Sequence, residues 1–125
     1  MPQKRSAFFI SDRTGITAEM LGHSLLTQFE MVAFNEVTLP FVDSVEKAHA
    51  AVRQINDQGN RDGTRPLIFS TLVNQDVSSV VGTANALFLD CFDIFIRPME
   101  KELGVSASHA VGRSHSANDF ADYHH

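Results

Sequence analysis

The apolar residues of the chain fall into short continuous runs that are separated by longer segments with helical spacing. The first run, Ala7–Ile10, is too short for a helix and rich in aromatic and β-branched side chains, so it predicts a buried strand. Later runs predict strands at Val37–Val42, Leu67–Leu72 and Ala86–Leu89. Leu67–Leu72 is nearly continuous in apolar character, which is typical of a strand covered on both faces of a parallel sheet.

Between the strands, apolar side chains recur every three or four positions, which is typical of amphipathic helices. Three such helices are predicted, and a fourth, short one is predicted over Pro98–Leu103, with Pro98 in its first turn and Gly104 just past its end. The stripes that define the first three helices are Ala18, Leu21, Leu25, Leu26 and Phe29; Val45, Ala48, Val52 and Ile55; and Val77, Val80, Val81 and Ala84.

Polar residues that can cap helices precede each stripe, because their side-chain oxygens accept hydrogen bonds from free backbone N–H groups of the first turn. Gly59 is placed to end the second helix, which leaves Gln58–Arg65 as a surface turn. Pro40 marks the end of the second strand or an edge position in the sheet. The predicted N-caps are Thr14, Asp43 or Ser44, and Asn74 or Asp76.

The alternation of strands and helices predicts an α/β fold, a mostly parallel sheet of about four strands with helices on both faces and right-handed crossovers. Residues 1–104 are expected to form this domain. Residues 105–125 change to Ser, His, Asn, Asp and Gly, and we interpret them as a polar linker. Within that segment Ser116, Asp119, Phe120 and Tyr123 suggest the start of a helix that the chain truncates.

Composition narrows the function classes. The net charge of −5 argues against nucleic-acid binding, which requires a basic face. No apolar stretch approaches the roughly 20 residues that span a bilayer, and the N-terminus lacks the apolar core of a signal peptide, so we expect no membrane partner. The single cysteine, Cys91, excludes an internal disulfide and is expected to pack in the core. These features predict a soluble cytoplasmic protein.

Polar residues follow each predicted strand, and the carboxyl ends of parallel strands meet at one edge of the sheet, where such sheets bind ligands. Hydroxyls and helix N-termini there suit a phosphate. Asp12, Asp43 and Asp90 would repel it unless a Mg²⁺ lay between, and Arg13 is the only basic side chain in these turns. The alternative is that Asp12, Asp43 and Ser44 only cap helices. The residues expected at this edge are Ser11, Asp12, Thr14, Gly15, Asp43, Ser44, Thr71, Asn74, Gln75 and Asp90.

The turn Ser11–Gly15 is not a P-loop, because it lacks the G-x-x-x-x-G-K-[ST] pattern and its lysine, and no such pattern occurs elsewhere in the chain. A complete phosphoryl-transfer site is therefore not expected from these residues by that route.

The histidines do not predict a metal site, because no pair has the i, i+4 spacing of a zinc-binding helix and no cysteine pairs accompany them. His23 is expected to pair with Glu19 on the helix surface. The remaining expectations are loop histidines at His109, His115, His124 and His125, the last two native or part of a tag, and packing roles for Met20, Met31 and Met99.

The stretch Ser11–Glu19, followed by Leu21–Phe29, resembles the start of the kinase/pyrophosphorylase family, the regulatory proteins of phosphoenolpyruvate synthase, whose plant relatives regulate pyruvate, phosphate dikinase. Arg13 departs from the family, which usually has a small residue there. The resemblance also implies that the family's P-loop lies in a C-terminal domain that this chain does not contain.

The resemblance implies a full-length enzyme that uses ADP to phosphorylate a threonine of the synthase, inactivating it. It also implies the reverse activity, a phosphate-dependent removal of the phosphoryl group from that threonine, which yields pyrophosphate. Ser11, Asp12, Arg13, Thr14 and Gly15 are then the candidate residues for binding ADP and phosphate, and Asp12 and Thr14 are the candidate catalytic residues. The chain alone would be inactive.

Two other hypotheses remain open. One is a non-catalytic docking or dimerisation module, which would bind the synthase or a second copy of itself without binding nucleotide. The other is a stand-alone flavodoxin-like binder of nucleotide or phosphate, which the absence of a glycine-rich fingerprint disfavours.

Overall fold

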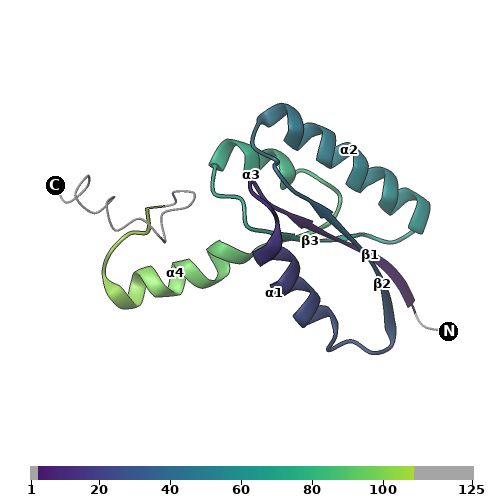
Figure 1. The fold of residues 1–125 in the computed structure, drawn as a ribbon, viewed down its shortest axis with the longest axis horizontal. Coiled ribbons are helices and arrows are strands. Elements are labelled where there is room, and N and C mark those ends of the chain that lie inside the picture. The colour runs from purple at the N-terminus through teal and green to yellow at the C-terminus, as the bar shows by residue number, and fades with distance from the viewer. Residues whose placement is uncertain (1–2, 109–125) are drawn as a thin grey trace.

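The structure, a computed structural model, describes residues 3–108 and confirms the predicted α/β fold. Strands and helices alternate along the chain, and the four strands form one parallel sheet in the order β2-β1-β3-β4 (Figure 1). The elements are β1 (Gln3–Ile10), α1 (Ile16–Leu26), β2 (Val32–Leu39), α2 (Val45–Asp62), β3 (Leu67–Ser70), α3 (Gln75–Val81), β4 (Leu87–Asp90) and α4 (Cys91–Leu103).

Helices lie on both faces of the sheet, as right-handed crossovers require. α2 and α3 pack together over one face and α1 packs on the other (Figure 1). The central strand β1 supplies both cores, with Phe8 and Ile10 in the core beneath α2 and α3, and Ala7 and Phe9 in the core beneath α1. Successive side chains of a strand point to opposite faces, so this continuous apolar run serves two layers at once.

The second strand differs from its prediction. β2 spans Val32–Leu39 instead of Val37–Val42, and it pairs with β1 from Gln3↔Val32 to Ile10↔Leu39. The sequence pattern did not predict the first half of β2, because β2 is an edge strand and this half mixes polar and apolar residues. Pro40 follows the last residue of β2, a position that suits proline because proline has no backbone N–H to donate within the sheet.

The helix ends confirm some predicted caps and correct others. Ser44 caps α2 by accepting the Lys47 N–H (3.1 Å), and Asn74 caps α3. The prediction of Gly59 as the end of α2 was wrong, because the helix continues to Asp62 and Gly63 adopts the left-handed conformation (φ 71°) that ends it. Residues 58–62 are therefore helical instead of a turn.

Gly59 has a packing role instead. A Cβ at this position would lie 2.9 Å from Pro66 Cδ, so the missing side chain lets the polypeptide before β3 approach the helix.

The last helix is longer than predicted. α4 begins at Cys91 directly after β4, its N-cap is Asp90, and Pro98 lies inside it instead of in its first turn. Gly104 ends it in the left-handed conformation (φ 72°), as predicted. Cys91 is buried, and this burial together with the nearby Asp90 carboxylate raises the pKa of its thiol.

Several residues expected to pack are exposed. Met20, Met31 and Met99 are all exposed, as are Leu25 and Phe29 of the first predicted stripe. The buried positions of α1 are Ala18, Gly22 and Leu26. The helix thus approaches the sheet through Ala18 and Gly22, and Leu26 packs in the core at its end, while Leu25 lies outside the contact.

The remaining predictions on the tail concern His109, His115, His124, His125 and the helix start near Ser116, which lie outside the described residues. The domain boundary at residue 104 stays a prediction. None of the described helices is long and apolar enough to cross a membrane. Within residues 3–108 no cluster of three or more His, Cys, Asp or Glu side chains is arranged to hold a metal ion.

Candidate functional site

The strand order creates a topological switch point between β1 and β3. The chain leaves β1 for β2 on one side and returns to β3 on the other, so α1 and α3 lie on opposite faces of the sheet. The loops after β1 and β3, residues 11–15 and 71–74, therefore diverge at the carboxyl edge. Open α/β sheets bind ligands at this position.

The turn after β1 is fixed by hydrogen bonds to the connection after β2. Ser11 is buried, its N–H donates to the Leu39 carbonyl (3.2 Å), and its Oγ accepts the Arg13 N–H (2.9 Å). The carbonyls of Ser11 and Arg13 accept the N–H groups of Val42 (2.9 Å) and Phe41 (2.8 Å). These four hydrogen bonds give the turn one defined shape.

Asp12 joins the loops on the two sides of the switch point. Its side chain is half-buried, and its Oδ2 accepts the N–H of Val73 in the loop after β3 at 3.4 Å. The alternative that Asp12 caps a helix was therefore wrong. This is the one hydrogen bond of the carboxylate within residues 3–108, and a carboxylate has about four acceptor sites. Asp12 retains capacity for a cation or a donor.

Gly15, not Thr14, is the N-cap of α1, which corrects the predicted cap. Its φ of 86° favours glycine, and a Cβ there would lie 2.8 Å from Thr38 Cγ2. Thr14 is exposed and its Oγ1 accepts the Ile16 N–H at 3.4 Å, a long and weak contact. The turn thus buries Ser11 and Gly15 and leaves the Arg13 and Thr14 side chains in solvent.

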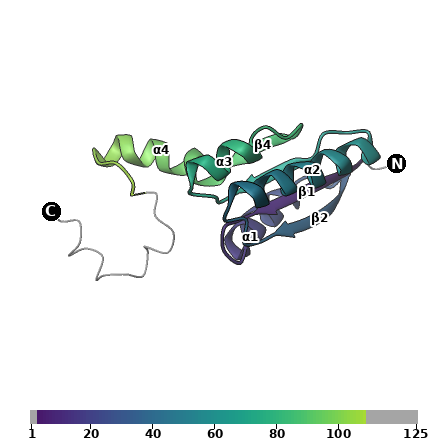
Figure 2. The same ribbon diagram turned by 90° about the horizontal axis from the view of Figure 1, so that it is seen from above.

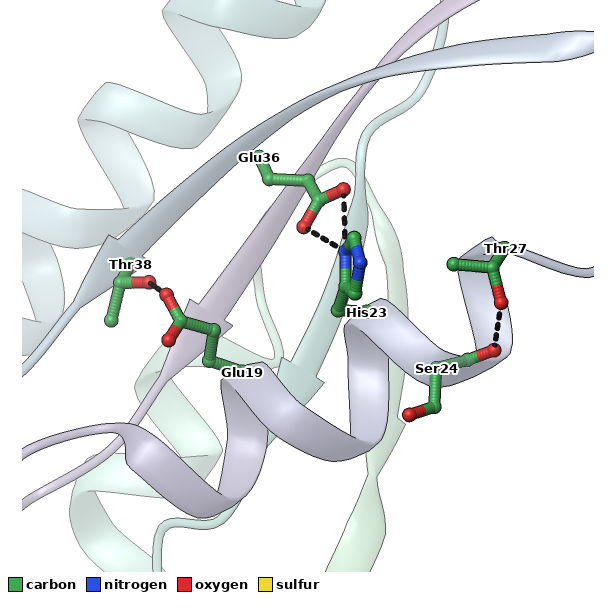
Figure 3. A network of polar contacts seen from close by, with 6 residues as sticks. All are labelled: Glu19, His23, Ser24, Thr27, Glu36 and Thr38. Atoms are coloured by element: carbon green, nitrogen blue, oxygen red, sulfur yellow. Dashed lines mark hydrogen bonds and ion pairs between the residues drawn. The ribbon is translucent and has the colours of Figure 1, made fainter.

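Polar side chains of α1 contact β2 beside this turn (Figure 3). The Thr38 hydroxyl donates to Glu19 Oε2 (3.0 Å), and His23 Nδ1 lies 2.9 Å and 3.1 Å from the two oxygens of Glu36. The predicted His23–Glu19 pair was therefore wrong. Glu19 and His23 each pair with a residue of the edge strand β2, Thr38 and Glu36 respectively, and not with each other.

The other residues predicted at this edge have structural partners. Ser44 and Asn74 cap helices, and Asp90 caps α4 by accepting the Asp93 N–H (3.0 Å). Asp43 is not the cap of α2. Instead it pairs with Lys47 at 2.8 Å, and this hydrogen bond lowers the pKa of the Asp43 carboxyl. The two remaining positions are Thr71, which is buried, and Gln75, which is exposed at the start of α3.

Phe41 is a residue of this edge that the sequence did not indicate. It has a φ of 57°, the one positive value among the described residues other than glycine, and its side chain is 54% exposed. Phenylalanine rarely adopts this conformation, and such strained residues cluster at functional sites. No sequence pattern predicts a positive φ at a bulky residue, so only the backbone geometry identifies it.

Together these residues suit an anion more than a free metal ion. The N-cap Gly15 has no side chain to cap α1, and the one side-chain acceptor of a first-turn N–H within residues 3–108 is the weak contact of Thr14 with Ile16. First-turn N–H groups therefore remain available beside the exposed Arg13 and Thr14. Asp12 opposes an anion by charge unless a divalent cation bridges the two, which its open acceptor sites allow. The lysine and glycine-rich loop of a P-loop are missing from the chain, so a complete phosphate site would need further residues.

Comparison with known proteins agrees with the resemblance of the turn. Curated relatives, provisionally named phosphoenolpyruvate synthase regulatory proteins, occur in Pseudomonas savastanoi pv. phaseolicola (53% identical), Pseudomonas fluorescens (53%) and Ectopseudomonas mendocina (51%). Each match covers 120 residues, which are 96% of this chain and 44% of the relative. The chain thus spans less than half the length of these relatives.

A family model described as kinase/pyrophosphorylase matches residues 7–125, which include the second half of β1, the turn after it and all later elements. Because the match extends over nearly the whole sequence, the chain belongs to the kinase/pyrophosphorylase family.

Proposed function

We propose that this chain is the N-terminal part of a bifunctional enzyme that regulates phosphoenolpyruvate synthase. In one direction a threonine hydroxyl of the synthase takes the terminal phosphoryl group of ADP, which leaves AMP and an inactive synthase. In the other, inorganic phosphate takes that group from the phosphothreonine, which restores the hydroxyl and releases pyrophosphate. Family membership and the names of the relatives support this proposal.

The observation that carries the proposal for this chain is the position of the Ser11–Gly15 turn at the switch point, inside the matched region. Arg13, Thr14 and the N–H groups at the start of α1 would hold phosphate oxygens. Asp12 would hold Mg²⁺, which neutralises charge on the phosphates when bound. The residues that grip the nucleotide phosphates most firmly would come from the part of the relatives that this chain does not span.

The test uses a full-length protein that carries this sequence and measures ADP-dependent loss of synthase activity. We expect Asp12→Asn to lower the rate by roughly 100-fold, because the amide can still accept the Val73 N–H but no longer binds a cation. Thr14→Ala is expected to lower it by roughly 10-fold, the cost of about one lost hydrogen bond to a charged group.

Asp43→Asn is the matched control, since Asp43 lies at the same edge and its side chain pairs with the exposed Lys47. Its rate should equal that of the unmodified enzyme. Full activity in a Ser11/Asp12/Thr14 triple alanine variant that melts at the normal temperature would remove the turn from the catalytic site.

A second candidate function is a docking or dimerisation module without catalytic residues of its own. Several large apolar side chains at the surface favour it, because such patches on soluble proteins mark interaction sites. This candidate predicts that the isolated chain binds the synthase, or itself, and that ADP does not shift its melting temperature. A melting shift with ADP would instead support a stand-alone nucleotide binder.

A further inference from the structure

The two border strands of the sheet differ in how well they are protected against pairing with another chain. Figure 2 shows β2 along one border of the sheet, next to β1. The strand at the other border, β4, has four residues, and such short strands offer little for another chain to pair with. β2 has eight residues, and its pairing with β1 continues without a bulge. It contains neither proline nor lysine, so β2 lacks the features by which border strands usually avoid pairing.

The outer edge of β2 presents backbone groups that have no strand partner. The carbonyls of Met31 and Leu39 accept N–H groups of β1 and of the turn after it, at 3.1 Å and 3.2 Å. The backbone groups of successive residues point to alternate sides of a strand, so Phe34, Glu36 and Thr38 direct their N–H and C=O groups outward. Within residues 3–108, β1 is the one strand beside β2, which leaves these outward groups for a further strand.

The side chains of β2 are also incompletely covered. None of its eight residues is buried, whereas the last five residues of β1 are. Val37 and Leu39 pack against the core beneath α2 and α3, and Phe34 packs against the core beneath α1, yet all three stay partly exposed. A strand added to β2 would therefore cover apolar side chains on both faces of the sheet.

Acidic side chains lie along this edge on the face that α1 covers. A groove of about 350 Å³ beside β2 includes Glu30, Phe34 and Glu36 in its lining, and no lysine or arginine of the described residues lines it. Glu30 is exposed, and Figure 3 shows Glu36 pointing from β2 toward His23. A second copy of the chain would bring the same carboxylates to the groove, where like charges repel. The groove instead suits an extended segment that carries a lysine or arginine.

The carboxyl end of β2 lies beside the candidate site. Gly15, at the end of the turn after β1, lies against Thr38, because a Cβ on Gly15 would be 2.8 Å from Thr38 Cγ2. Neighbouring strands lie about 4.8 Å apart, so a strand added to β2 would end about 10 Å from β1. A segment that continues past this end would reach the loops at the carboxyl edge.

We propose that β2 binds an extended segment of the target protein as a fifth strand, with a basic side chain of that segment in the groove at Glu30 and Glu36. Main-chain hydrogen bonds to β2 hold the segment and the groove selects it, which is the mode of recognition by strand addition. The inference rests on the proposed function, because the target is then phosphoenolpyruvate synthase. The bound segment is the one that leads to the acceptor threonine, which it delivers to the edge where Asp12 and Thr14 lie.

The first test is the dissociation constant between phosphoenolpyruvate synthase and a full-length protein that carries this sequence, measured by biolayer interferometry. Glu36→Pro removes an outward N–H and places a ring on the outer edge of β2, but it leaves the hydrogen bonds to β1 in place. Glu36→Ala is the matched control, since it removes the same carboxylate and keeps the N–H. We expect Glu36→Pro to bind at least about 10-fold more weakly than Glu36→Ala. Equal dissociation constants for the two folded variants, or no binding by the unmodified protein, would overturn the proposal.

A second pair of variants tests the groove without altering the backbone. Glu30→Lys reverses a charge in the groove, and Asp57→Lys makes the same change at an exposed position of α2, on the opposite face of the sheet. We expect Glu30→Lys to weaken binding roughly 10-fold and Asp57→Lys to change it by less than about 2-fold. Equal effects of the two substitutions would contradict a basic segment in this groove, whether or not Glu36→Pro folds.

Kinetics separate this inference from the proposed function. In the ADP-dependent inactivation of the synthase, Glu36→Pro should raise the KM for the synthase at least about 10-fold over Glu36→Ala and leave the KM for ADP unchanged. An unmodified protein that binds the synthase but does not inactivate it with ADP would refute the proposed function, and the binding data would still decide the role of β2. An active enzyme in which both variants share one KM for the synthase would refute the role of β2 alone. A change in mass of Glu36→Pro by sedimentation equilibrium would assign the edge to a second copy and overturn the inference.

Discussion

Gly22 gives the sharpest test of how closely α1 approaches the sheet. It is buried in the middle of the helix, and a Cβ there would lie 2.3 Å from Phe9 Cε1 and 3.0 Å from Phe69 Cδ2. Both rings are buried and pack on each other, with their centroids 5.8 Å apart. Neither ring can turn aside without disturbing the core beneath α1.

Two effects of Gly22→Ala oppose each other. Alanine improves the helix by about 1 kcal/mol, whereas overpacking a filled core costs about 1–3 kcal/mol. Because the contact to Phe9 is far inside the van der Waals limit, we expect the upper part of that range and a net loss of about 1–2 kcal/mol in the free energy of unfolding.

Urea denaturation followed by circular dichroism measures this difference. Ser24→Ala, at an exposed position of the same helix, is the control and should gain about 0.5 kcal/mol from helix propensity alone. If Gly22→Ala proved as stable as the unmodified chain or more stable, the close approach of α1 to Phe9 would be refuted.

Three further predictions concern stability. Ser6→Ala removes the hydrogen bond to Asp62 Oδ2 (2.7 Å) and should cost about 1 kcal/mol at neutral pH. The hydrogen bonds from Ser6 and Gln58 lower the pKa of Asp62 in the folded protein. Their contribution to stability is therefore complete above the unfolded pKa of about 3.9 and is lost as pH falls through the lower folded pKa. Chemical denaturation should show the stabilities of Ser6→Ala and the unmodified chain converging in acid. Phe41→Gly should be about 1 kcal/mol more stable than Phe41→Ala in thermal melts, since both remove the ring but only glycine relieves the positive φ; equal stability would contradict the strain. Asn74→Ala should cost about 1 kcal/mol, because two N–H groups of α3 lose their acceptor, and Asn74→Asp should restore most of it.

The sequence alone determined the features that depend on local chemistry. The apolar runs at β1 and β3 marked buried strands because the period of two places side chains on both covered faces. Ser44 and Asn74 predicted helix starts because their side chains accept hydrogen bonds from N–H groups of the first turn. Gly104 predicted a helix end because glycine readily adopts the left-handed conformation found there. The order of elements then fixed the fold class.

Only the tertiary structure decided how distant segments meet. The bond from Asp12 to Val73 joins residues that are 61 positions apart, and the φ of Phe41 depends on its hydrogen bond to the turn after β1. The direction of α4 follows from a strand and a helix that meet without a loop, and helical periodicity carries no information about it. Periodicity and capping act within one or two turns of the chain, whereas a site at a sheet edge exists only after the strands are ordered.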